Sequence, residues 1–168
     1  MVVFMDVELR AILAMGVCGS GKSTFGRALA DQLNADFIEG DDYHSAENVA
    51  KMASGKPLDD ADRWPWLRAL NAEIRIKQQA GRSIVFGCSA LKAAYRELLS
   101  EGVAGWAIVY LEGSRELLHA RLEGRAGHFM QSAMLESQLA TLEVPDEAIV
   151  VSIADPVAVS VERVLKAL

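Results

Sequence analysis

Residues 16–23 read Gly16-Val17-Cys18-Gly19-Ser20-Gly21-Lys22-Ser23, and this stretch decides the fold of the 168-residue chain. It matches the pattern G-x-x-x-x-G-K-[ST], whose glycines let backbone N–H groups turn inward around phosphate oxygens. An apolar run at 11–15 precedes the loop, and apolar residues recur every fourth position over 25–33. The sequence therefore predicts a strand, a phosphate loop and a helix over 22–33, the context that this pattern needs.

The loop predicts ATP binding with Mg²⁺. The N-terminus of the following helix adds a partial positive charge, Lys22 is expected to reach the β- and γ-phosphates, and the Ser23 hydroxyl is expected to ligate Mg²⁺. Cys18 takes a free position of the pattern, and we interpret it as a small loop residue rather than a redox group. The expected nucleotide-binding residues are Gly16, Val17, Cys18, Gly19, Ser20, Gly21, Lys22, Ser23 and Thr24.

Short apolar runs alternate with amphipathic segments along the rest of the chain. Further strands are expected at 37–38, 83–88, 106–111 and 149–153, and further helices at 45–53, 62–79, 91–99, 115–122 and 132–142. Asp62, Ser114, Ser132 and Asp155 are candidate helix N-caps, with Pro156 at the first position of the last helix. Five apolar strands separated by helices predict an α/β fold, with one parallel sheet covered by helices on both faces, in a single domain over residues 1–168.

Polar residues follow several of the expected strands, at the edge of the sheet where ligands of such folds bind. The segment Glu39-Gly40-Asp41-Asp42 ends the second strand. A carboxylate there can accept a proton from a substrate hydroxyl or orient Mg²⁺ through water. Asp41 is the candidate base, Glu39 a candidate outer metal partner, and His44 a candidate donor to a substrate oxygen, within an acceptor-binding region at about 41–66.

Basic residues and a glycine-containing loop complete the predicted site. An anionic substrate and a γ-phosphate would recruit some of the basic residues near the strand ends. Residues 123–130 hold two glycines, an arginine and a histidine between two helices, which is typical of a lid that excludes water and brings positive charge to the transferring phosphoryl group. The basic candidates are Arg63, Lys92, Arg96, Arg121, Arg125 and His128.

The composition excludes several other classes of protein. The formal net charge of −6 argues against nucleic acid as the main partner, because binding a phosphate backbone needs a concentrated positive face. The apolar runs are too short for a membrane span, and the N-terminus lacks the pattern of a signal peptide. Two cysteines do not make a disulfide framework. We expect a soluble cytoplasmic protein.

Several longer stretches resemble one family. They are GVCGSGKST after Met15, EGDDYHS over 39–45, NVAKMASGKPLDDADRWPWL over 48–67, CSALK over 88–92, YLEG over 110–113 and LEGRAGHFM over 122–130. The chain resembles the gluconate kinase (gluconokinase) family of small P-loop kinases, relatives of shikimate and nucleoside-monophosphate kinases. The resemblance implies a nucleoside-monophosphate-kinase-like fold with a small lid at about 123–131, and a homodimer. It also implies phosphorylation of D-gluconate at its 6-hydroxyl by ATP, giving 6-phosphogluconate and ADP.

The resemblance also assigns roles to residues of this chain. It places Asp41 at the sugar hydroxyl, with Arg125 serving the lid and Arg121 near adenine or phosphate. The substrate contacts that it implies are His44, Arg63, Lys92, His128 and Gln138. The alternatives are a related small-molecule kinase, of the shikimate type or for another sugar acid, and an ATP-binding regulatory module without catalysis. The presence of Lys22, Ser23 and Asp41 favours an enzyme over that module.

Overall fold

Five parallel strands form one sheet at the centre of the computed structural model, which describes residues 8–125 and 128–168 without the side chains of 128–130. The strands are β1 (Ala11–Met15), β2 (Asp36–Glu39), β3 (Ile84–Gly87), β4 (Trp106–Glu112) and β5 (Ile149–Ser152). Their order in the sheet is β2-β3-β1-β4-β5. The strand that leads into the phosphate loop therefore lies in the middle, with a neighbour hydrogen-bonded on each side.

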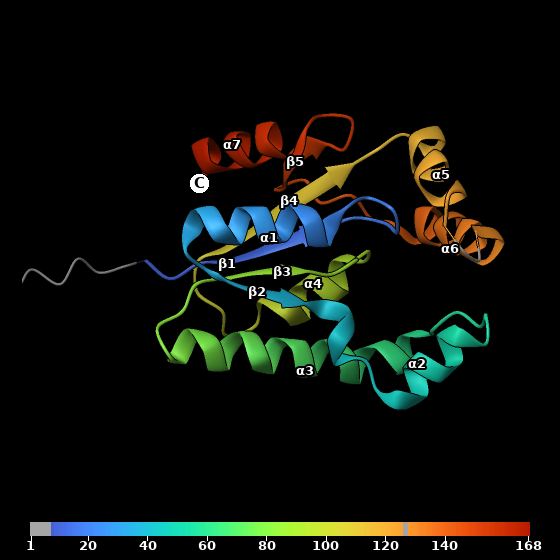
Figure 1. Ribbon diagram of the computed structural model, residues 1–168. Helices are drawn as coiled ribbons and strands as arrows, with labels where there is room; N and C mark the ends of the chain where they lie inside the picture. Colours follow the sequence, from blue (N-terminus) through green and yellow to red (C-terminus); the bar gives the residue numbers. More distant parts are fainter. Residues whose placement is uncertain (1–7, 126–127) are drawn as a thin grey trace, which may run out of the picture.

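Helices cover both faces of this sheet, which confirms the predicted fold class (Figure 1). Helices α1 (Lys22–Leu33) and α7 (Val157–Ala167) lie on one face, and α3 (Asp60–Gln79) and α4 (Ala93–Ser100) on the other. Because successive side chains of a strand point to opposite faces, β1 serves two hydrophobic cores. Ile12 packs in the core with α1 and α7, and Leu13 packs in the core with α3 and α4.

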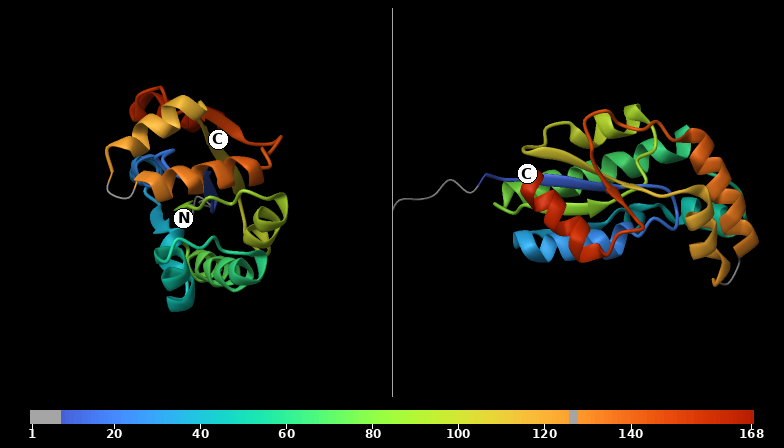
Figure 2. Two further views of the ribbon diagram at one scale, coloured as in Figure 1. Left: turned by 90° about the vertical axis from the view of Figure 1, so that its right-hand side faces the viewer. Right: turned by 90° about the horizontal axis from the view of Figure 1, so that it is seen from above.

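The remaining helices lie beyond the carboxyl ends of the strands (Figures 1 and 2). They are the 3₁₀ helix η1 (Gly40–Tyr43), α2 (Ala46–Ala53), α5 (Arg115–Glu123) and α6 (His128–Thr141). Helices α5 and α6 pair through Glu136, which forms an ion pair with Arg115 Nη1 at 3.0 Å and lies 2.7 Å from His119 Nε2. Among the residues described, no helix is long and apolar enough to cross a membrane.

Two of the predicted helix starts on the acceptor side are wrong. Helix α3 begins at Asp60, and its N-cap is Asp59 rather than Asp62. Asp59 accepts from Asp62 N at 2.9 Å, and Asp62 accepts from Asp59 N at 3.0 Å. This reciprocal pair is a capping box, so Asp62 occupies the third helical position. Helix α4 begins at Ala93 rather than near 91, because Ala90 has a φ of +45° and Lys92 is still extended.

The start of α6 is also earlier than predicted. The helix begins at His128, whereas the sequence predicted a loop to 130 and a cap at Ser132. Ser132 lies inside the helix, and its hydroxyl is 3.2 Å from His119 Nδ1, so it joins α6 to α5. Residues 126 and 127 of the predicted lid lie outside the described residues. The last helix, α7, has Pro156 rather than Asp155 at its N-cap, a shift of one residue.

Candidate active site

The phosphate loop connects β1 to α1 at the carboxyl edge of the sheet. Gly19 and Gly21 have φ angles of +82° and +84°, in the left-handed region that favours glycine. Lys22 Nζ donates to Val17 O at 3.1 Å, so the ammonium group lies back over the loop. The Ser20 hydroxyl is buried and has no hydrogen-bond partner among the described residues. Because buried polar groups are normally paired, this unpartnered hydroxyl in a turn of backbone donors fits a phosphate ligand.

The electrostatic surroundings of Lys22 combine burial with nearby negative charge. Burial lowers the pKa of Lys22 below its ordinary value, and the carboxylates of Asp41 and Glu39 are close enough to oppose that shift. Among the described residues this ammonium group has one hydrogen-bond acceptor, so it has donors to spare for a phosphate. The loop therefore presents a partly buried cation at the N-terminus of α1, where the helix dipole also favours an anion.

Ser23 and Glu39 form a pair of oxygen ligands beside the loop. The Ser23 hydroxyl, in the first turn of α1, donates to a carboxylate oxygen of Glu39, the last residue of β2. Hydroxyl and carboxylate oxygens are the ligands that Mg²⁺ prefers, and a magnesium ion usually takes only one or two of them from the protein. The pair thus fits Mg²⁺ bound next to a triphosphate, and this role stays a prediction.

A cavity of about 360 Å³ lies on the other side of the loop, between it and the carboxyl end of β5. Gly19, Thr24, Arg121 and Arg125 are among the residues that line it. Arg121 Nη2 donates to Ile153 O at 2.6 Å, and its Nη1 lies 3.4 Å from Gly19 O. Arg121 and Arg125 thus line one cavity beside the phosphate loop, and their expected roles, Arg121 near adenine or phosphate and Arg125 in the lid, stay predictions.

The turn that carries Asp41 is fixed by two aromatic side chains. Trp66 Nε1 donates to Gly40 O at 2.8 Å, and the His44 ring stacks on Trp66 with 4.0 Å between ring centroids. The His44 side chain is 5% exposed, and burial lowers its pKa. The Asp41 side chain is 79% exposed, with Oδ1 3.8 Å from His44 Nε2. A rigid turn therefore holds an accessible carboxylate beside a buried imidazole.

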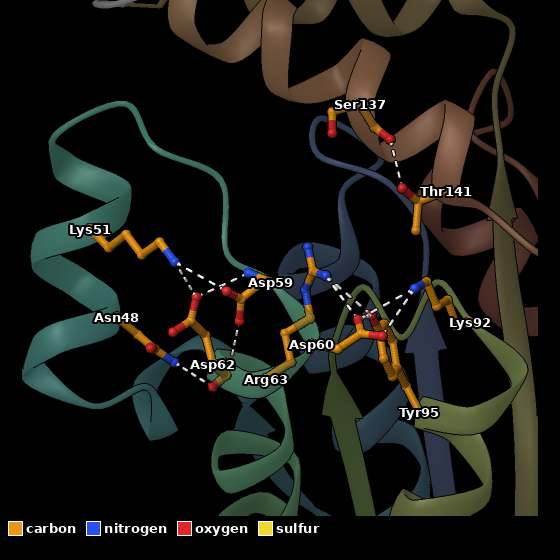
Figure 3. Close-up of polar contacts among 10 residues, drawn as sticks. All are labelled: Asn48, Lys51, Asp59, Asp60, Asp62, Arg63, Lys92, Tyr95, Ser137 and Thr141. Atoms are coloured by element: carbon orange, nitrogen blue, oxygen red, sulfur yellow. Dashed lines mark hydrogen bonds and ion pairs between the residues drawn. The ribbon is translucent and has the colours of Figure 1, made fainter.

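Arg63 and Lys92 converge on a carboxylate that the sequence reasoning missed (Figure 3). Lys92 Nζ lies 3.3 Å from both oxygens of Asp60, and Arg63 Nη1 lies 3.4 Å from Oδ1. The Tyr95 hydroxyl donates to Asp60 and accepts from Arg63 Nη1 at 3.1 Å. Asp60 and Tyr95 occur within or next to the stretches that carry the family resemblance, and that was the only signal for them in the sequence.

Two of the other predicted residues have different surroundings from those expected. Arg96 is buried, and its Nη1 donates to Ala90 O at 2.8 Å, so it supports a loop instead of facing the pocket. Gln138 Oε1 accepts from Cys18 N at 2.7 Å, which places this side chain at the phosphate loop, away from the Asp60 cluster.

Burial raises the pKa of Cys18, so its thiol is a poor nucleophile, in line with its interpretation as a loop residue. The side chain of His128 lies outside the described residues.

A phosphate loop with a desolvated lysine, an accessible carboxylate near it and a cationic cluster beyond define a P-loop phosphotransferase. Residues 12–145 match the AAA domain family. The thermoresistant gluconokinase of Escherichia coli (strain K12) is 44% identical over 146 residues, which are 84% of this chain and 83% of that protein. The chain belongs to the gluconokinase family.

Two solved structures resemble the whole described fold. One is a sugar kinase from Janibacter sp. HTCC2649, with a TM-score of 0.87 and 44% identity, covering 94% of this chain and 93% of that one. The other is a gluconokinase from Sinorhizobium meliloti 1021, with a TM-score of 0.83 and 43% identity, covering 94% and 90%. Both likenesses therefore extend over nearly the whole chain.

Proposed function

We propose that the enzyme transfers the γ-phosphoryl group of ATP to the 6-hydroxyl of D-gluconate, giving 6-phosphogluconate and ADP. The observation that carries the proposal is that the chain is 44% identical to a gluconokinase over 84% of its length, and the accessible carboxylate of Asp41, in the turn after β2, supports it. A carboxylate beside a phosphate-binding lysine is placed to hold an acceptor alcohol next to the transferring phosphoryl group.

On the nucleotide side, the amides of 16–24 surround the phosphates and Lys22 contacts the β- and γ-oxygens. Ser23 would hold Mg²⁺, with Glu39 as an outer partner of the ion. Bound Mg²⁺ supplies positive charge that neutralises the oxygens of the triphosphate. Arg121 lies near the adenine or the phosphates, and Arg125 brings positive charge to the transferring group from the lid at about 123–131.

On the acceptor side, Asp41 accepts a hydrogen bond from the 6-hydroxyl and takes its proton as the new bond forms. A loose phosphoryl-transfer transition state needs an oriented hydroxyl more than a strong base, which suits the exposed carboxylate of Asp41. His44, Arg63 and Lys92 contact the sugar acid within the region 41–66. The positive charges of Arg63 and Lys92 and the negative charge of Asp60 sum to one positive charge, which is complementary to a singly charged aldonate.

The remaining roles extend the family resemblance. Gln138 and His128 on α6 contact the substrate near the reacting group, and for Gln138 the bond to Cys18 N supports a position beside the phosphate loop. We also propose one domain over 1–168, a homodimer, a cytoplasmic location and a supply of 6-phosphogluconate to the pentose phosphate pathway. Light scattering of the purified protein tests the homodimer, and a monomeric mass would contradict it.

The experiment is a substrate panel. Purified enzyme with ATP and Mg²⁺ is offered D-gluconate, other aldonates, the neutral sugar D-glucose and shikimate, and ADP release is followed by a coupled assay. We expect turnover with gluconate, less with other aldonates and little with glucose or shikimate, and phosphorus NMR should show a 6-phosphate ester. Absence of gluconate turnover, or faster turnover of shikimate, would contradict the proposal.

A further inference from the structure

Helix α4 begins with a residue that cannot cap it. Lys92 is the N-cap residue, and a lysine side chain has donors but no acceptor for the free N–H groups of the first turn. The acceptor comes from elsewhere in the chain. Glu143 Oε2 accepts from Ala93 N at 2.7 Å, and Glu143 N donates to Leu91 O at 2.8 Å. One residue from the segment after α6 thus holds the backbone on both sides of Lys92.

The loop before Lys92 needs such support because its backbone is strained. Ala90 is buried and has a φ of +45°, a region that residues other than glycine seldom adopt. Such a conformation persists only where surrounding contacts enforce it. Arg96 provides one set of contacts, from its Nη1 to Ala90 O at 2.8 Å and to Leu91 O at 3.1 Å. Glu143 provides the other set of contacts, to Leu91 O and Ala93 N. Its negative charge also raises the pKa of the Arg96 guanidinium, which burial lowers.

We propose that Glu143 is a positioning residue for Lys92: its bonds to Ala93 N and Leu91 O fix the backbone on both sides of Lys92 and so direct the Lys92 side chain toward Asp60. The proposal rests on the proposed function, in which Lys92 contacts the sugar acid. It also connects the two halves of the site. Helix α6 contacts the phosphate loop through Gln138 and ends at Thr141, two residues before Glu143. A shift of α6 would therefore reach both the phosphate loop and Lys92.

The kinetic test compares Glu143→Ala with Glu143→Gln. Loss of a helix cap changes a local equilibrium by roughly two- to thirty-fold. We therefore expect Glu143→Ala to raise the KM for gluconate by about that factor, with the KM for ATP unchanged. Glu143→Gln keeps an acceptor oxygen and should recover most of the loss. The matched control is Glu97→Ala, which removes an exposed carboxylate from α4 itself and should leave both constants unchanged.

A double variant separates positioning from a general loss of structure. If Glu143 acts through Lys92, Glu143→Ala should add little to the KM of Lys92→Met, because effects that pass through one contact are not additive. The same multiplication of KM in both backgrounds would overturn the proposal, as would an unchanged KM in the single variant. Should Glu143→Ala fail to fold, the comparison is made with Glu143→Gln, for which a smaller rise is expected that again disappears in Lys92→Met.

Two measurements need no turnover. The Ala93 amide should exchange its hydrogen faster in Glu143→Ala than in Glu97→Ala. The pKa of Lys92, which the hydrogen bond to Asp60 raises, should fall toward its ordinary value when followed by NMR of its side chain. An unchanged Lys92 pKa together with faster Ala93 exchange would reduce Glu143 to a helix cap and overturn the positioning role. If the unaltered enzyme shows no gluconate turnover, the proposed function fails, while these two measurements still decide the role of Glu143.

Discussion

Lys22→Met should separate catalysis from stability. In the folded protein Lys22 makes one hydrogen bond, to Val17 O, among the described residues, and burial lowers its pKa. A lysine whose pKa is lowered by folding destabilises the fold while it is charged, so removing the charge at neutral pH relieves a cost. Methionine keeps the apolar stem of the side chain. We expect the fold to survive and phosphoryl transfer to be lost.

The expected loss of activity is large, whereas the expected loss of stability is small. A hydrogen bond from a charged donor contributes about 1.5–3 kcal/mol, so contacts to two phosphate groups amount to about 3–6 kcal/mol in the transition state. At about 1.4 kcal/mol per factor of ten, kcat should fall roughly 10²- to 10⁴-fold. For the fold, the lost bond to Val17 O is offset by relief from burying a charge, which costs several kcal/mol. The free energy of unfolding should therefore fall by no more than about 1 kcal/mol.

The assays are the coupled measurement of ADP release with gluconate and urea unfolding followed by circular dichroism. The matched control is Lys166→Met, which removes an exposed lysine from α7 that pairs with Glu162 at 2.7 Å. An exposed i,i+4 pair contributes about 0.3–0.5 kcal/mol, so the control should keep its activity and nearly all its stability. A kcat within tenfold of the unaltered enzyme would refute the role of Lys22, and a large loss of stability would refute the reasoning about its burial.

Three other predictions concern the acceptor side and the metal. Asp41→Asn should lower kcat roughly 10²- to 10⁴-fold with little change in the KM for ATP, and an unchanged kcat would remove Asp41 from the role of base. Glu39→Gln should raise the Mg²⁺ concentration for half-maximal rate roughly 10- to 100-fold, and an unaltered metal dependence would argue against an outer metal partner. Burial lowers the pKa of His44 in the folded protein below its unfolded value of 6.5. The stability that neutral His44 allows is complete above pH 6.5, and it is lost as the pH falls from 6.5 through the folded pKa, because the unfolded chain binds the proton more readily. Urea unfolding between pH 7 and 5 should thus show a steeper loss for the unaltered protein than for His44→Asn, and equal slopes would contradict this.

Local sequence patterns predicted much of the fold. The phosphate loop and the helix over 22–33 were predicted where the structure has them. Both depend on residues that are close together in the chain, namely the glycines of the loop and apolar side chains spaced four residues apart. Helix starts were less accurate. At α3 two aspartates could each act as the cap, and at α6 the candidate serine is bonded to His119 instead.

The sequence by itself determined the class of fold and predicted the phosphate loop, and through the resemblance it predicted which basic residues contact the acceptor. Tertiary structure alone decided that Lys92 joins Asp60, that Gln138 contacts the phosphate loop, and that Glu143 caps α4. These contacts join residues 32, 120 and 50 positions apart in the chain. The pattern of neighbouring residues does not specify such pairs, because they form only when the order of strands brings separate helices to the same edge of the sheet.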